Sequence, residues 1–132
     1  MKLEEYLNNV SGKGVLATSD SDGKVNVAIY SKPHFTEDGS LAFIMRDRLS
    51  HHNLLSNPHA AYMLIEQGPS YEGIRLHIEK IKESKDQELI ASMTRRNLSA
   101  EEDKAAGEKF LVYFSVVKVL PLIGGGESPV TV

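Results

Sequence analysis

The sequence predicts a mainly β domain of the α+β class, a small six-stranded antiparallel β-barrel with a few short helices. Three observations lead to this prediction. Six segments have the length and the apolar or alternating pattern of strands, short Asp-Gly turns join the early ones, and the helical patterns are few and short. Closing such a sheet into a barrel hides the strand edges that a flat sheet exposes.

Composition is that of an ordinary globular protein. The chain has 132 residues, of which 41% are hydrophobic and 25% charged, enough for one domain with a real core. We take residues 1–123 as that domain and the Gly-rich residues 124–132 as a flexible C-terminal tail. The net charge of −3 argues against nucleic acid and anionic membranes as partners. Without cysteine, disulfides and thiolate chemistry are excluded.

The expected location is the cytoplasm. The N-terminus carries Glu4 and Glu5 where a secretion signal has an apolar core. No segment is long and apolar enough to span a bilayer, and the best run, residues 110–120, is interrupted by Ser115 and Lys118.

The first half of the chain predicts a short helix and two hairpins. Residues 2–9 have amphipathic helical spacing, and residues 14–19 form an apolar strand. The turn at residues 20–23 leads into residues 24–30, which alternate between two faces. A second hairpin turns at residues 37–40 and continues into the apolar strand 41–45.

The polar stretch from Arg46 to Pro58 carries the functional interpretation. Ser50 is a good N-cap for a helix because its hydroxyl can accept the amide of Asn53, and Pro58 ends the helix. A helix start offers unpaired amides and partial positive charge, so Arg46, Arg48 and Ser50 form a plausible phosphate cradle. A capped surface helix with two solvated arginines is the alternative.

The second half adds three strands and two short helices. Residues 60–66 and 71–81 read as strands, with a slip in alternation at residues 80–81 that predicts a bulge. Residues 86–96 read as a helix, and the capping box at residues 99–102 predicts another. Residues 110–120 form a strand that is apolar on both faces and needs a cover on each, for which a second subunit is a candidate.

Taken in this order, the chain resembles the pyridoxamine 5′-phosphate oxidase-like family, the FMN-binding split barrels. The likeness spans roughly residues 3–120 in order and spacing. It is carried by Gly14-Val15-Leu16-Ala17-Thr18 with the Asp22-Gly23 turn, Val25 to Tyr30, Leu41-Ala42-Phe43-Ile44, Ser50-His51-His52-Asn53-Leu54-Leu55-Ser56-Asn57-Pro58 and Ala61-Tyr62-Met63-Leu64-Ile65.

The resemblance implies a six-stranded antiparallel split β-barrel that forms a homodimer with FMN between the subunits. Arg46, Arg48 and Ser50 sit where family members contact the phosphate, and Asn53 is in the helix turn beneath. The positions beside the isoalloxazine ring are Ala28, Ile29, Tyr30 and Ser31.

Two functional hypotheses follow. The first is an FMN-binding flavoprotein, an oxidoreductase or electron carrier whose cofactor supplies the redox chemistry. The second is a non-enzymatic split-barrel module that binds haem or F420, or no cofactor. The cluster of Arg46, Arg48 and Ser50 favours FMN. Many family members carry a lysine or arginine shortly before the Asn-Leu pair, where this chain has Ser50, His51 and His52, and this difference favours the module. True pyridoxamine 5′-phosphate oxidases carry a C-terminal extension that this chain lacks, so that activity is not assigned.

No side chain is nominated as a catalytic acid or base, and no metal site is expected. His51 and His52 point about 100° apart on a helix, so they do not readily share a metal and read as solvated or as phosphate contacts. Arg75 and His77 share a strand face that looks toward either solvent or a dimer groove. Arg95 and Arg96 complement a helix C-terminus or reach a partner's phosphate.

Overall fold

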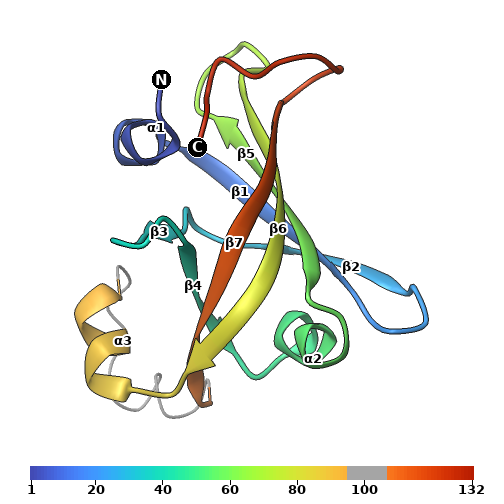
Figure 1. Cartoon of the computed structure of the whole chain (residues 1–132), viewed down its shortest axis with the longest axis vertical. Coiled ribbons are helices and arrows are strands. Elements are labelled where there is room, and N and C mark those ends of the chain that lie inside the picture. The colour runs from blue at the N-terminus through green and yellow to red at the C-terminus, as the bar shows by residue number, and fades with distance from the viewer. Residues whose placement is uncertain (95–106) are drawn as a thin grey trace.

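The computed structural model describes residues 1–94 and 107–132, which form three helices and seven strands (Figure 1). In chain order they are α1 (Leu3–Asn9), β1 (Gly12–Ser19), β2 (Val25–Ile29), β3 (His34–Phe35), β4 (Leu41–Arg46), α2 (Leu49–Ser56), β5 (His59–Glu66), β6 (Gly73–Ser84), α3 (Gln87–Met93) and β7 (Lys109–Pro121). None of the helices in these two ranges is long and apolar enough to cross a membrane.

All seven strands belong to one antiparallel sheet with the order β2-β1-β5-β6-β7-β4-β3. The predicted mainly β, antiparallel architecture with short helices is therefore confirmed. Two details of the prediction are corrected. A seventh strand, β3, pairs only two residues with β4, which is too short to leave a pattern in the sequence. The sheet is also open, because no strand pairing in the described ranges joins β2 to β3.

The long strands β6 and β7 bend the sheet into its curled shape (Figure 1). Their register shifts twice, between His77 and Ile78 and between Lys80 and Lys82. Each irregularity increases the local twist of the strand. The bulge predicted at residues 80–81 is confirmed, and it brings the ends of the sheet around a common core.

An aromatic cluster forms the centre of that core. The ring of Phe43 on β4 makes edge contacts with the rings of Tyr30, Tyr62 and Phe114, at centroid distances of 6.0, 5.1 and 5.6 Å. Helix α1 adds the buried side chains of Leu3, Tyr6 and Leu7. Because Phe43 and Tyr30 also border the functional cleft described below, the core and the cleft share a wall.

The first half of the second face of β7 is covered within the chain. Leu111 on β7 packs with Ala42 on β4 and Ile90 on α3 in a small core of its own. Helix α3 thus supplies the apolar cover for the first half of this face of the strand. Further along, Val117 remains exposed. The predicted helix over residues 86–96 begins as expected, with the Asp86 carboxylate accepting two backbone amides, but ends at Met93.

The end of the chain returns to its start (Figure 1). The amide of Leu3 donates to the carbonyl of Thr131 at 2.6 Å, and the Thr131 amide donates to the Met1 carbonyl at 2.9 Å. Val130 is buried against the main core. These contacts involve the last residues of the predicted tail, 124–132.

Replacing Gly14 with alanine is expected to destabilise the fold by about 1–3 kcal/mol, the usual cost of overpacking. A Cβ atom at Gly14 would overlap the Tyr62 hydroxyl and the Tyr30 carbonyl, which are hydrogen-bonded to each other at 3.1 Å. Urea unfolding measures the effect. Gly125→Ala is the matched control because a Cβ there meets nothing. Equal unfolding free energies for the two variants would contradict the prediction.

Candidate functional site: a cationic cleft at the start of α2

A cleft of about 660 Å³ opens between β2, β4 and the start of α2, with the ends of α3 and β7 at its rim. Seven of the eight residues predicted to bind the cofactor border it: Ala28, Ile29, Tyr30, Ser31, Arg46, Arg48 and Ser50. The eighth, Asn53, does not. It is buried beneath the cleft, where its side-chain amide donates to the Thr18 hydroxyl at 3.1 Å and ties α2 to β1.

The lining of the cleft has a strongly uneven charge. Among the described residues that border it are four permanent cations, Lys32, Arg46, Arg48 and Lys109, and no carboxylate. The whole chain, by contrast, carries a net charge of −3. Cations gathered in a concave site raise the local concentration of anions. The cleft is therefore suited to an anionic ligand.

Helix α2 begins earlier than the sequence predicts. Arg48 rather than Ser50 occupies the N-cap position, and its carbonyl accepts the first helical hydrogen bond, from the His52 amide at 2.9 Å. The amides of Leu49, Ser50 and His51 consequently have no acceptor inside the helix. The prediction is corrected because Ser50 lies in the first turn, where it is buried and its side chain faces Tyr30 instead of capping the helix.

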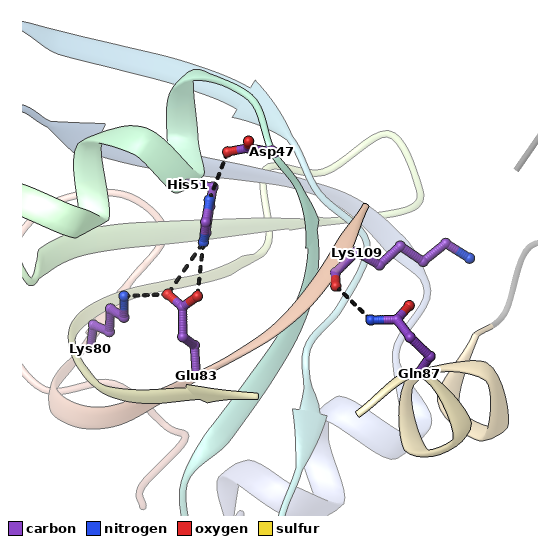
Figure 2. Close-up of polar contacts among 6 residues, drawn as sticks. All are labelled: Asp47, His51, Lys80, Glu83, Gln87 and Lys109. Atoms are coloured by element: carbon purple, nitrogen blue, oxygen red, sulfur yellow. Dashed lines mark hydrogen bonds and ion pairs between the residues drawn. The ribbon is translucent and has the colours of Figure 1, made fainter. Parts of the chain in front are cut away.

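Arg46 lies across from Lys109, because strands β4 and β7 pair these two residues. The Arg46 guanidinium also donates to the Gly107 carbonyl at 2.5 Å. The backbone carbonyl of Lys109 accepts a hydrogen bond from the side-chain amide of Gln87 on α3, at 3.2 Å (Figure 2). Sequence reasoning missed Lys109, and only the pairing of two distant strands brings it to the cleft.

Tyr30 forms the junction between the apolar and cationic parts of the cleft. Its backbone is held on both sides, since its amide donates to the Gly14 carbonyl at 3.0 Å and its carbonyl accepts the Tyr62 hydroxyl. Burial raises the pKa of the Tyr30 phenol, while the Ser50 hydroxyl and the Arg48 charge act in the opposite direction. The net pKa is raised, so the phenol keeps its proton at neutral pH and can donate a hydrogen bond.

His51 is buried, with 3% of its surface exposed, and this corrects its interpretation as a solvated side chain. Its ring stacks on Phe110 at a centroid distance of 4.0 Å. Figure 2 shows it between two carboxylates: Nδ1 lies 3.1 Å from Asp47, and Nε2 lies 3.2 Å from Glu83. Glu83 also accepts from the Lys80 ammonium at 2.6 Å. The local sequence does not signal that His51 is buried, because its contacts Glu83 and Phe110 lie far along the chain.

Apart from His34, the other candidates lie away from the cleft or outside the described ranges. His52, His59 and His77 are exposed, and Arg75 donates to the carbonyls of Pro121 and Gly124. His34, which is not among the residues predicted to bind the cofactor, borders the cleft. Arg95, Arg96 and the capping box at residues 99–102 lie outside the residues that the structure describes.

An open, curled antiparallel sheet with a cleft where its third long strand meets a short helix is a split-barrel architecture. The chain adopts the split-barrel fold of the pyridoxamine 5′-phosphate oxidase-like proteins, as the resemblance predicted. No protein-family model matches the sequence, and no curated protein matches it.

Three solved structures illustrate the likeness. An FMN-binding protein from Syntrophomonas wolfei subsp. wolfei has a TM-score of 0.71 and 22% identity, with 91% of this chain and 83% of that chain covered. An F420 reductase has a TM-score of 0.66 and 15% identity, with 89% of this chain and 95% of that chain covered. A candidate pyridoxamine 5′-phosphate oxidase from Lactobacillus delbrueckii has a TM-score of 0.66 and 16% identity, covering 89% of each chain. Proteins of this fold thus include binders of flavin-type cofactors.

Proposed function

We propose that the chain is an FMN-binding flavoprotein, an oxidoreductase or electron carrier that holds FMN in the cationic cleft. The observation that carries this proposal is the joining of two unlike surfaces in one cleft. The cleft is bordered by the cations Arg46 and Arg48 and by the start of α2, whose first amides have no acceptor inside the helix. Apolar side chains from β2 and β4 border the same cleft. FMN has the matching pair of parts, a phosphate and a flat ring.

The dimensions and chemistry of the cleft fit this ligand. A volume of about 660 Å³ lies within the usual range of small-molecule sites, roughly 300–1,000 Å³. Arg48, Ser50 and the first amides of α2 would hold the phosphate. Ala28, Ile29 and Ile44 would lie along the ring, and the polar backbone of β2 would meet its edge. Bound FMN would supply hydride or electron transfer.

We further propose that the chain works as a homodimer. Edge strand β2 turns Val25, Val27 and Ile29 outward with 81%, 67% and 77% of their surfaces exposed, while the alternate residues of the same strand border the cleft. A row of exposed β-branched residues on an edge strand is a ready surface for pairing with another chain. A partner seated there would also close the side of the cleft that Ile29 borders.

Val27→Lys is expected to convert the dimer to a monomer, because dimerisation would then bury an unpaired charge in an apolar interface. Sedimentation velocity of the wild type and the variant measures the change. Lys24→Gln, at the exposed residue just before the same strand, is the control. A monomeric wild type, or a variant that stays dimeric, would contradict the proposal.

The visible absorption spectrum of the purified protein tests the cofactor, before and after incubation with FMN and gel filtration. Retained flavin bands support the proposal. A protein that lets all FMN pass through refutes it, and the same experiment with F420 and with haem then tests the alternative binding module. For haem, His34 is the histidine to replace first because it borders the cleft.

A further inference from the structure

We propose that His51 is a positively charged positioning residue, whose imidazolium holds the first turn of α2 in the geometry that binds the phosphate and makes that binding depend on pH. This inference rests on the proposed function of the cleft. The His51 side chain does not border the cleft. It acts through the segment 48–50, which immediately precedes it and contains two of the proposed phosphate contacts.

The contacts of the ring identify its protonation state. Nδ1 faces the Asp47 carboxylate at 3.1 Å, and Nε2 faces both oxygens of Glu83 at 3.2 Å. An ionised carboxylate only accepts hydrogen bonds, and a neutral imidazole has a single N–H to donate. A neutral ring would therefore aim a nitrogen lone pair at one of the carboxylates. Only the imidazolium donates to both.

The position of this charge requires an explanation. A cation in the first turn of a helix opposes the helix dipole, so it is unfavourable by itself. Burial adds to the cost of the charge. The two carboxylates offset both effects, and the stacked ring of Phe110 limits the ring to one orientation. We infer that these contacts of His51 serve to fix the start of α2 to the sheet.

The geometry links α2 to two distant strands. Asp47 lies in the turn between β4 and α2, and Glu83 lies on β6 (Figure 2). Phe110, which stacks on the His51 ring, lies on β7. Helix α2 is otherwise joined to β1 through the bond from Asn53 to Thr18. The His51 contacts therefore anchor the start of the helix, and the Asn53 contact anchors its middle. Loss of the first anchor would leave Arg48 and Ser50 less well placed.

The charged groups around His51 have opposing effects. Asp47 and Glu83 favour the imidazolium, whereas Lys80, bonded to Glu83, and Lys85, at 5.4 Å from the centre of the Phe110 ring, disfavour it. Burial raises the pKa of Glu83, but the hydrogen bonds and charges of Lys80 and His51 together outweigh burial, so the net pKa of that carboxyl is lowered. A lowered folded-state pKa means that Glu83 contributes stability above its unfolded-state pKa and loses it as acid protonates the carboxylate.

The first experiment compares FMN dissociation constants of the wild type and His51→Gln from pH 5.5 to pH 8.5. Glutamine can donate to one carboxylate but cannot carry the charge. We expect the variant to bind about tenfold more weakly at low pH, the factor expected for one lost charge-assisted hydrogen bond. The two proteins should converge at high pH. Protonation of the FMN phosphate affects both proteins alike, so the ratio of their constants isolates His51.

His52→Gln is the matched control, because His52 is the exposed neighbour on the same helix. This variant should follow the wild type across the pH range. A constant ratio between the wild type and His51→Gln at all pH values would overturn the proposal, since a merely structural role would not change with protonation. An equal effect of His52→Gln would overturn it as well.

The second experiment needs no ligand and separates this proposal from that of FMN binding. Nitrogen NMR of the wild-type ring should find both His51 nitrogens protonated at pH 6, and the amide signals of residues 49–51 should move as that proton is lost. In His51→Gln they should not move with pH. A neutral His51 ring at pH 6, or amides that do not respond, would overturn the positioning role even if FMN binds. If FMN fails to bind while the amides respond, the proposed function alone is refuted.

Discussion

Replacing Arg48 with alanine is expected to weaken FMN binding by about tenfold to a hundredfold, because hydrogen bonds to charged groups each contribute roughly 1.5–3 kcal/mol. Arg48 borders the cleft, caps α2 and lies beside the unpartnered amides of the first turn. Its guanidinium can therefore reach a phosphate that the helix start already attracts. Flavin fluorescence titration at constant salt measures the dissociation constant.

The control for this prediction removes the same charge elsewhere. Lys118 is exposed on β7 and does not border the cleft. Lys118→Ala should bind FMN as the wild type does, because a distant exposed charge is largely screened. Wild-type affinity in Arg48→Ala would remove this arginine from the site. An equal loss in both variants would mean that only the net charge matters.

Replacing Phe43 with alanine is expected to destabilise the fold by about 3–5 kcal/mol, the usual cost of removing a buried aromatic side chain. Phe43 is 2% exposed and contacts three other aromatic rings. Domains are stable by only about 5–15 kcal/mol, so most of the stability could be lost. The loss should also release Tyr30, whose ring rests on Phe43. Urea denaturation followed by circular dichroism measures the change.

Two further variants make this result interpretable. Phe43→Leu keeps most of the volume and should cost less than about 1.5 kcal/mol, so it remains folded and its FMN affinity can be measured. Tyr71→Ala removes a side chain that is 80% exposed and should change stability by less than about 0.5 kcal/mol. A loss in Phe43→Ala no larger than that in Tyr71→Ala would show that the aromatic cluster is not the centre of the core.

Much of the fold was predictable because its signals are local. Strand β4 is a short apolar run after an Asp-Gly turn, and β6 alternates until its bulge. The start of α2 was also signalled locally, although the predicted N-cap, Ser50, lies two residues after the observed N-cap, Arg48. Arg46, Arg48 and Ser50 are close in sequence, so a site there could be inferred before the fold was known.

The rest of the cleft could not be inferred in this way. Lys109 reaches it only because β7 pairs with β4, and the pairing of distant strands leaves no signal in a single sequence. The two-residue strand β3 and the open edge of the sheet were missed for the same reason, since both depend on which strands meet. The residues bordering the cleft from β2 were assigned through a family resemblance.

His51 marks the division between the two kinds of information. By itself the sequence determined that two consecutive histidines, His51 and His52, follow Ser50 at the start of a helix. Helical periodicity separates the directions of two neighbours, but it does not say which of them faces the protein. Only the tertiary structure decided that His51 turns inward between Asp47 and Glu83. The physical reason is that burial and charge pairing depend on groups far away in the chain, whereas turns, caps and alternation depend on neighbours.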